Sequence, residues 1–410
     1  MANLPAAFID YTRQLMGENR FERYLKSFEE EAPVSIRLNP KKLDLSQWQL
    51  DVSHEPVPWC RNGYYLTQRP NFTFDPLFHA GCYYVQEAAS MFLDEIITQK
   101  EPSLLCTLDL CAAPGGKSTL LRSALPADCV LYSNEPIRNR ANILLENVTK
   151  WGYDNHIVTN AYPEAYRKSK MKFDLILCDV PCSGEGMFRK DEATIREWSP
   201  QQVEKCWPLQ RDIVKDAWAC LNSGGLLIYS TCTFNTKENE ENIRWILETF
   251  DDAEVVPVDV NPDWHITGSL LPGFSEPVYR FIPGISRGEG LFVCVLRKQM
   301  RNEKGEMRNA ATHSPAKNIS SLNHLHSSFL IPHSSFHVDL PYSDALKYLR
   351  GEALVLPPDT PRGIVTLTFM GHPLGTAKNI GSRANNLYPK EWRIKTTHIP
   401  NEYKPILKQI

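Results

Sequence analysis

The sequence of 410 residues lacks several features that would place it in familiar protein classes. It has no apolar run that approaches the roughly 20 residues required by a membrane-spanning helix. Its N-terminus has no basic segment followed by an apolar core, so we expect no signal peptide. The net charge is only −3, which argues against a globally basic nucleic-acid binder. These absences favour a cytoplasmic protein with no membrane partner.

The 11 cysteines include no C-x-x-C pair and no cluster with histidine at the spacing of a metal site. We therefore expect no structural zinc and no metal cofactor. In a reducing cytoplasm the cysteines are free thiols, and most of them are expected to fill the core.

Charge and composition change along the chain. Residues 301–410 carry 14 Lys+Arg against 8 Asp+Glu, so the excess of acidic residues lies in the preceding 300. A basic C-terminal module on an acidic body suits local attraction to a polyanion. Residues 301–335 are rich in Ser, His and Asn, and the irregular spacing of their histidines favours a linker over a metal-binding tract. We predict an N-terminal extension (1–80), a central domain (81–300), a polar linker (301–335) and a C-terminal module (336–410).

Apolar strand candidates alternate with helical segments between residues 104 and 298. This alternation predicts an α/β fold with a mostly parallel, doubly wound sheet. The predicted strands are 104–110, 130–135, 157–161, 173–180, 225–234 and 291–298, and the predicted helices are 117–125, 137–151, 200–221 and 236–250. Outside this region we expect an amphipathic stretch at 8–28 and strands at 34–40, 353–357 and 363–371.

The first strand of this region leads through CAAPGGKS (111–118) into a helix. Glycine lets the backbone approach a ligand closely, and the start of the helix offers free N–H groups. The turn matches neither GxGxxG nor a Walker loop, which disfavours a dinucleotide or ATP. Glu135 ends the next strand and can accept hydrogen bonds from two ribose hydroxyls, although a solvated carboxylate is the plain alternative. Together these features suggest a nucleoside cofactor without pyrophosphate, and S-adenosylmethionine fits.

Two cysteines follow the ends of predicted strands. Cys182 follows the strand 173–180, and Cys232 lies at the end of the strand 225–234. If these strands are neighbours, both thiols open on one cleft at the carboxyl edge, where ligands bind. Two buried structural cysteines are the alternative, but the flanking Gly, Ser and Pro residues argue against simple packing.

A methyl donor beside two thiols suits methylation of a pyrimidine at carbon-5. A thiolate that adds to carbon-6 turns the ring into an enolate-like species, whose carbon-5 can attack an electrophilic methyl group. Asp179 is placed to support the charge shift near ring nitrogen N3. A second thiol can take part in removing the carbon-5 proton or in release. These considerations do not decide which of the two thiols attacks.

Several motifs resemble the signatures of the Nol/Nop/Sun family of RNA 5-methylcytosine methyltransferases. The matching segments are CAAPGGKS (111–118), DVPCSGEGMFRKD (179–191), YSTCTF (229–234), AGCYYVQEAASM (80–91) and RGEGLFVCVLRK (287–298). The resemblance implies a Rossmann-like, S-adenosylmethionine-dependent methyltransferase sheet. It also implies that Cys232 attacks the cytosine and that Cys182 assists release.

The same resemblance implies which residues line the cofactor and the target base. Lys117 and Asp179 would lie near the base as well as the cofactor. Some family members have an acidic residue after the third strand, where this chain has Asn160, so no cofactor carboxylate is assigned there. The implied cofactor residues are Cys111, Ala112, Ala113, Pro114, Gly115, Gly116, Lys117, Glu135, Arg140 and Asp179.

Both ends of the chain resemble RNA-binding parts of RsmF-type ribosomal RNA methyltransferases. Residues 345–354 and 371–395 resemble their PUA-like β-barrel module, and the N-terminal segment resembles their small α+β extension. The implied partner is ribosomal RNA, with a small-subunit target, or a ribosomal subunit, bound by a monomer. A transfer-RNA cytosine-C5 methyltransferase and a non-catalytic RNA-binding assembly factor are the alternatives. The target base must be unpaired or flipped to reach the thiols.

Overall fold

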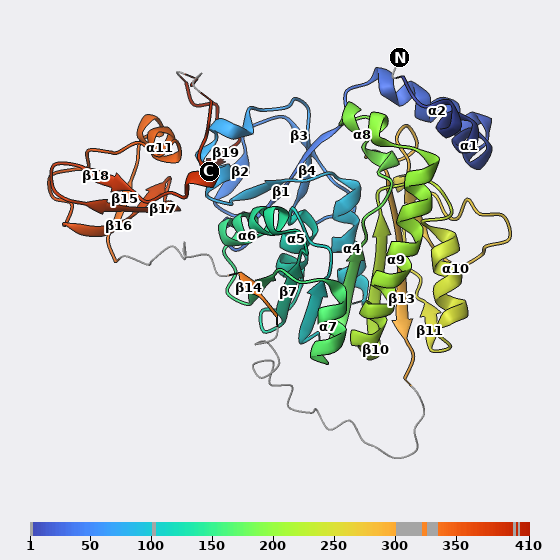
Figure 1. Ribbon diagram of the computed structural model, residues 1–410. Helices are drawn as coiled ribbons and strands as arrows, with labels where there is room; N and C mark the ends of the chain where they lie inside the picture. The colour runs from blue at the N-terminus through green and yellow to red at the C-terminus, as the bar shows by residue number, and fades with distance from the viewer. Residues whose placement is uncertain (1–2, 101–103, 301–321, 326–334, 397–398, 401) are drawn as a thin grey trace.

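The computed structural model describes residues 3–100, 104–300, 322–325, 335–396, 399–400 and 402–410. Within these residues, a nine-stranded sheet has the order β11-β13-β10-β9-β6-β7-β8-β14, with β12 paired to β13 (Figure 1). The strands are β6 (Cys106–Asp109), β7 (Val130–Asn134), β8 (His156–Thr159), β9 (Phe173–Asp179), β10 (Leu221–Thr231), β11 (Ala253–Val255), β12 (Tyr279–Phe281), β13 (Leu291–Lys298) and β14 (His324–Leu325).

The inner strands of this sheet are parallel, and helices cover both faces. One face packs against α4 (Phe92–Lys100), α5 (Gly116–Ala124) and α6 (Arg138–Trp151). The other packs against α7 (Pro163–Ser169), α9 (Pro200–Cys220) and α10 (Glu240–Thr249). Strand order reverses around β6, which pairs with β7 on one side and β9 on the other. All six strands and four helices predicted between residues 104 and 298 are confirmed, with ends that differ by a few residues.

The N-terminal part combines two helices with an antiparallel sheet. The helices α1 (Ala6–Met16) and α2 (Glu18–Lys26) lie near α8 (Glu192–Glu197) in Figure 1. The sheet has the order β3-β4-β1-β5. Its strands are β1 (Val34–Leu38), β3 (His54–Pro56), β4 (Gly63–Leu66) and β5 (Tyr83–Val85), and the short helix α3 (Pro76–His79) follows β4. The predicted boundary at residue 80 therefore falls inside this sheet.

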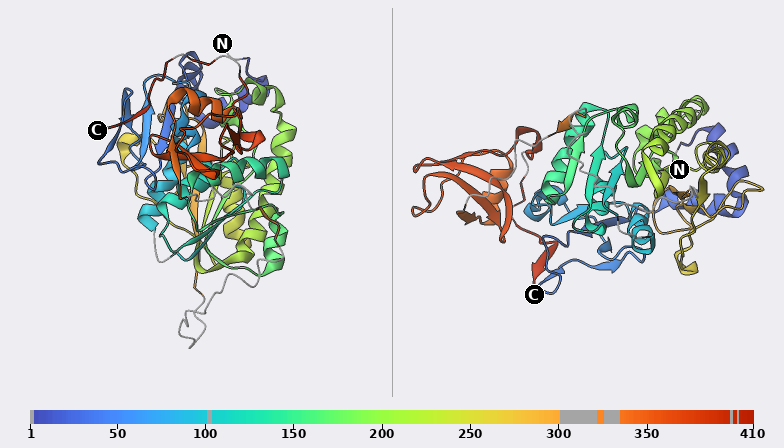
Figure 2. Two further views of the ribbon diagram at one scale, coloured as in Figure 1. Left: turned by 90° about the vertical axis from the view of Figure 1, so that its left-hand side faces the viewer. Right: turned by 90° about the horizontal axis from the view of Figure 1, so that it is seen from below.

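The C-terminal module is a four-stranded sheet with one helix, and it lies beside the N-terminal sheet (Figures 1 and 2). Its elements are β15 (His337–Asp339), α11 (Tyr342–Leu349), β16 (Gly363–Phe369), β17 (His372–Asn379) and β18 (Ala384–Asn386). The last strand of the chain, β19 (Leu407–Gln409), leaves this module and pairs with β2 (Trp48–Leu50). Ile36 and Leu77 of the N-terminal part share one hydrophobic core with Leu346 and Leu367.

The strand predicted at 353–357 is wrong, because only Leu354 forms an isolated bridge, to Ala384. Pro357 and Pro358 follow at once and cannot donate ladder hydrogen bonds, and Val355 is 80% exposed. Most of the predicted linker 301–335 lies outside the described residues, although His324 and Leu325 within it pair with β8.

Among the described helices, none combines the length and the apolar character needed to cross a membrane.

Arg280 and Glu240 form an ion pair whose side chains are 1% and 0% exposed. Arg280 also donates a 2.8 Å hydrogen bond to the carbonyl of Phe234, close to Cys232. We expect Arg280→Met to lower the free energy of unfolding by about 3–5 kcal/mol, because it leaves a buried carboxylate without its partner. The midpoint of thermal unfolding measures the loss.

The double variant Arg280→Met/Glu240→Leu should recover much of that loss, because both charges are gone. Lys168→Ala is the matched control, since it breaks an exposed pair with Glu164 and should leave the midpoint almost unchanged. If Lys168→Ala lowers the unfolding midpoint as much as Arg280→Met does, or if Arg280→Met does not lower it, the buried ion pair does not have the stabilising role assigned to it.

Candidate active site

Two thiols meet at the carboxyl edge of the central sheet. Parallel pairing sets Ser230 of β10 opposite Asp179 of β9, so the segments that follow these strands leave the sheet together. The Sγ atoms of Cys182 and Cys232 are 3.2 Å apart and share a hydrogen bond, and the Cys232 N–H lies 3.4 Å from Cys182 Sγ. Both cysteines are free and partly exposed. The prediction that the two strands are neighbours and bring the thiols together is confirmed.

The protonation of Cys182 is set by its partner. Its hydrogen bond with Cys232 raises the pKa of the Cys182 thiol well above its ordinary value, and burial, the charge of Cys232 and the Glu238 carboxylate add to this effect. Cys182 is therefore a protonated thiol at neutral pH. Two thiolates at this separation would repel each other strongly, so the pair holds at most one negative charge.

A lysine–aspartate pair lies beside the thiols. Lys117 Nζ is 2.8 Å from one oxygen of Asp179, and Ser230 Oγ donates a 2.7 Å hydrogen bond to the other. Burial works against the charged form of Lys117, but the charge and hydrogen bond of Asp179, helped by Cys232, leave its pKa raised. Lys117 is thus an ammonium that interacts electrostatically with both Asp179 and Cys232.

Residues 110–115 connect β6 to α5 along the same edge, and Gly116 and Lys117 begin the helix. Gly115 has φ +116°, and a Cβ there would lie 3.2 Å from Leu144 Cδ1, so the turn requires glycine. Arg37 of β1 contacts the first turn of α5. Its guanidinium donates a 2.7 Å hydrogen bond to Thr119 Oγ1 and lies 3.4 Å from the carbonyl oxygen of Gly116. The N-terminal sheet therefore holds the predicted cofactor turn in place.

Glu135 and Arg140 form a second group at this edge. Glu135 follows β7, is 2% exposed, and makes a 3.3 Å ion pair with Arg140, which is 54% exposed. Arg140 also donates a 3.1 Å hydrogen bond to the carbonyl of Ala113, which ties the pair to the turn. Asn160, at the position where some family members have an acid, donates to the carbonyls of Glu135 and Pro136.

Sequence reasoning missed Asp109, the last residue of β6. Ser118 Oγ donates a 2.6 Å hydrogen bond to its Oδ2, whereas its buried Oδ1 has no hydrogen-bond partner among the described residues. Burial, with a contribution from the charge of Asp179, raises the pKa of Asp109 to about 7. Its position two residues before CAAPGGKS, next to the end of the predicted strand 104–110, was the signal that could have revealed it.

Two buried glutamates, also missed, fasten the two thiol loops to each other. Glu185 follows Cys182 in the chain and accepts hydrogen bonds from the backbone N–H groups of Phe234 and Asn235, at 2.7 and 3.0 Å. In the opposite direction, Glu238 follows Cys232 and accepts a 3.0 Å hydrogen bond from the N–H of Ser183. Each loop thus supplies a carboxylate that binds the backbone of the other.

Three family models match this chain, one for each of its N-terminal, central and C-terminal parts. A family model of the 16S rRNA methyltransferase RsmB/F matches residues 97–297. A model of the N-terminal domain of 16S rRNA methyltransferase RsmF matches residues 4–88, and one of the RsmF PUA domain matches residues 335–394.

The chain belongs to the RsmF family.

Sequence relatives of this RsmF-family chain agree with that assignment. The chain is 34% identical over 314 residues to the ribosomal RNA small subunit methyltransferase F of Pectobacterium carotovorum subsp. carotovorum. The matched residues make up 72% of this chain and 63% of the relative. A relative of the same name from Escherichia coli O139:H28 is 32% identical over 312 residues, with the same coverage of 72% and 63%. The chain therefore spans less than two thirds of the length of these relatives.

Solved structures support the fold of the RsmF-family chain. A methyltransferase homolog protein from Pyrococcus horikoshii matches with a TM-score of 0.60 and 28% identity, covering 72% of this chain and 96% of that one. NSun6 from the same organism, solved with SFG, matches with a TM-score of 0.59 and 18% identity, covering 73% and 99%. The predicted Rossmann-like methyltransferase sheet and the C-terminal PUA-like module are confirmed.

The Glu238 carboxylate should raise the pKa of the Cys182 thiol in this RsmF-family site. Glu238→Gln removes a negative charge that raises the pKa of Cys182, so we expect that pKa to fall. Alkylation of Cys182 by iodoacetamide should then set in at lower pH, because the thiolate is the reactive form. Mass spectrometry of the Cys182 peptide across a pH series gives the midpoint.

Glu248→Gln provides the control. Glu248 is exposed near the end of α10, so this substitution removes one negative charge at a position away from the thiols. A midpoint that stays in place or rises in Glu238→Gln would refute the electrostatic role.

Proposed function

We propose that this protein transfers a methyl group from S-adenosylmethionine to carbon-5 of a cytosine in ribosomal RNA. One observation carries the proposal: the Sγ atoms of Cys182 and Cys232 lie 3.2 Å apart at the ends of adjacent parallel strands, beside the Lys117–Asp179 pair. Addition of one thiolate to the ring, with assistance from a second thiol at release, requires this arrangement. Membership of the RsmF family and the names of its relatives support the methyl-transfer reaction.

The residues along the carboxyl edge fit S-adenosylmethionine. The glycine turn at Gly115 lets a ligand approach the backbone at the N-terminus of α5. Glu135 offers a carboxylate suited to ribose hydroxyls. The unpartnered, buried Oδ1 of Asp109 is an acceptor suited to a hydroxyl or an ammonium group. When bound, this cofactor would supply an electrophilic methyl group. The likeness to a structure solved with SFG, an analogue of the cofactor, is consistent with this fit.

Cys232 serves as the nucleophile in the proposed reaction. Its sulfur shares a hydrogen bond with Cys182 Sγ and interacts with the Lys117 ammonium, and its thiolate adds to carbon-6 of the cytosine. A bond forms between sulfur and carbon-6, and the electron pair of the carbon-5–carbon-6 double bond becomes available at carbon-5 for the methyl group. Asp179, held by Lys117 and Ser230, lies where it can stabilise the altered charge near the ring.

Cys182 acts at release, and its protonation follows the state of Cys232. Once the sulfur of Cys232 is a neutral thioether, the hydrogen bond and charge that raise the pKa of Cys182 are gone, so that pKa falls. Cys182 then loses its proton to solvent, and its thiolate takes the proton from carbon-5. The electrons of that C–H bond restore the ring double bond, the carbon-6–sulfur bond breaks, and Cys232 leaves as a thiolate.

The substrate class is proposed from the parts that flank the sheet. The matches to RsmF N-terminal and PUA models, together with relatives named for the small ribosomal subunit, support small-subunit ribosomal RNA as the target. The basic balance of residues 301–410 suits the same partner. We further propose that the extension 1–80, the central domain 81–300 and the module 336–410, joined by the linker 301–335, act together on this RNA.

Cys232→Ala should reduce methyl transfer by a factor of at least about 10³, because the covalent step is lost. Transfer of label from the methyl donor to ribosomal RNA from a strain without the gene measures the rate, and bisulfite sequencing of that RNA locates the cytosine. Cys220→Ala, which removes a buried thiol far along α9, should keep its activity. Undiminished transfer by Cys232→Ala would reject the nucleophile assignment.

Cys182→Ala should accumulate a covalent protein–RNA complex, because the adduct on Cys232 forms but its release is impaired. The complex is detected as a band that survives denaturing electrophoresis and disappears after ribonuclease treatment. The double variant Cys182→Ala/Cys232→Ala should show no such band. If Cys182→Ala gives no denaturant-stable complex and turns over normally, its role in release is wrong.

A further inference from the structure

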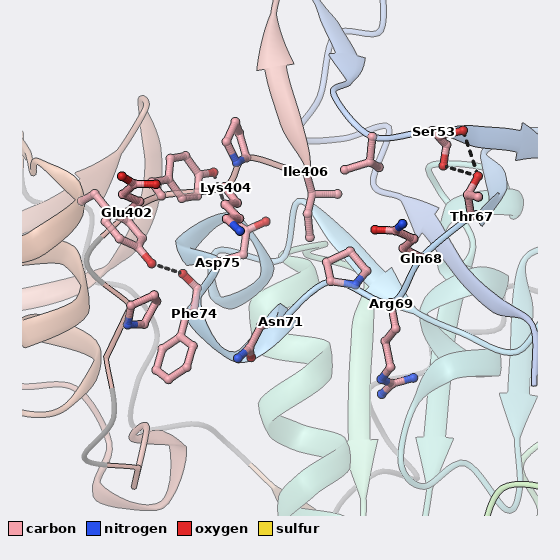
Figure 3. Close-up of a pocket in the computed structure, with 16 residues that line it drawn as sticks. Ser53, Thr67, Gln68, Arg69, Asn71, Phe74, Asp75, Glu402, Lys404 and Ile406 are labelled. Atoms are coloured by element: carbon pink, nitrogen blue, oxygen red, sulfur yellow. Dashed lines mark hydrogen bonds between the residues drawn. The ribbon is translucent and has the colours of Figure 1, made fainter. Parts of the chain in front are cut away.

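A large cavity lies away from the thiols, between the N-terminal sheet and the end of the chain. Its volume is about 920 Å³, within the range of ligand-binding sites. One wall comes from residues 52–53, 67–71 and 74–75, and the other from Pro400, residues 402–406 and Tyr342 of α11 (Figure 3). None of its lining residues belongs to the candidate active site. Two distant parts of the chain are therefore needed to build it.

Hydrogen bonds and ring stacking hold the inner wall of this cavity. The rings of Tyr342 and Tyr403 stack with centroids 4.7 Å apart, and the Tyr342 hydroxyl donates a 3.1 Å hydrogen bond to the carbonyl of Phe74. The hydroxyl of Tyr403 lies 3.2 Å from Asp75, a 2% exposed carboxylate that also accepts from Tyr83. Pairing of β19 with β2 fixes the chain just beyond the cavity. The aromatic wall is thus preorganised.

The rim carries positive charge and amide groups. Arg69 and Lys404 line the cavity with exposed side chains, and neither forms an ion pair with another described residue. Gln68 and Asn71 add exposed amides that can donate and accept hydrogen bonds, and Glu402 is the acidic residue at this rim. Figure 3 shows Arg69 and Asn71 on one loop and Lys404 on the separate C-terminal segment.

We propose that this cavity binds an unpaired nucleotide of the RNA substrate, away from the target cytosine. Aromatic walls stack bases, amides read their edges, and two cations at the rim suit the flanking phosphates. The inference rests on the proposed function, because it takes RNA as the substrate. It adds that the N-terminal sheet and the C-terminal tail select RNA jointly, through a single-stranded segment held at a fixed position relative to the thiols.

The test uses the full chain and a fluorescein-labelled, single-stranded RNA of mixed sequence. The variant Arg69→Ala/Lys404→Ala should bind this RNA about tenfold more weakly near 0.1 M salt. The slope of log affinity against log salt concentration should become shallower by about 1.4, since each lost phosphate contact on a single strand contributes about 0.7. The control Lys168→Ala/Lys205→Ala removes two exposed cations from α7 and α9 and should keep both values.

A second measurement needs no variant. RNA that contains 4-thiouridine should cross-link under ultraviolet light to peptides with Phe74 or Tyr403. If the double variant keeps the wild-type affinity and slope, and no cross-link maps to residues 67–75 or 402–406, the nucleotide site is refuted, even while methyl transfer persists. Cross-links there without methyl transfer by the wild type would uphold the site and reject the proposed function. If the variant binds naked RNA normally but no longer methylates a ribosomal subunit, the cavity serves a protein partner and the inference fails.

Discussion

The parallel pairing of β9 with β10 is the constraint on which the site depends. Asp179 and Ser230 are opposite each other in this register, and their hydrogen bond, with the Lys117–Asp179 pair, joins the ends of the two strands to α5. A slip of one residue would turn Asp179 to the other face of the sheet and separate the thiols. The buried residues on both faces of β9 and β10 resist such a slip, because it would disrupt their packing against the helices on each side.

The thiols themselves lie on irregular loops, so the sheet alone does not fix their separation. Glu185 and Glu238 bind the backbone of the opposite loop, and a buried carboxylate is tolerated only when it is hydrogen-bonded in this way. The N-terminal helices add an apolar brace. Phe8 packs against Phe188 after the first thiol, and Tyr24 packs against Phe234 after the second, with ring centroids 4.9 and 5.4 Å apart.

Much of this arrangement could be predicted from local sequence, and the remainder depends on contacts between distant residues. Apolar runs bounded by Gly, Ser and Pro located the strands and both thiols. Glu185 and Glu238 resemble ordinary surface acids in the sequence, because their partners are N–H groups about fifty residues away. The pairing of β19 with β2 joins opposite ends of the chain and leaves no local signal. The wrong strand at 353–357 shows that apolar composition alone does not supply a pairing partner.

The N-terminal sheet connects the cofactor turn to the C-terminal module. Arg37 reaches the start of α5 and lies 4.4 Å from the ring of Trp151, and although burial lowers its pKa to about 10, it remains charged at neutral pH. The other side of the same sheet shares a continuous core with the C-terminal module, so separating them would expose that core to water. In the proposed reaction, the target base must leave its stack to reach Cys232, which lies at the carboxyl edge of the central sheet.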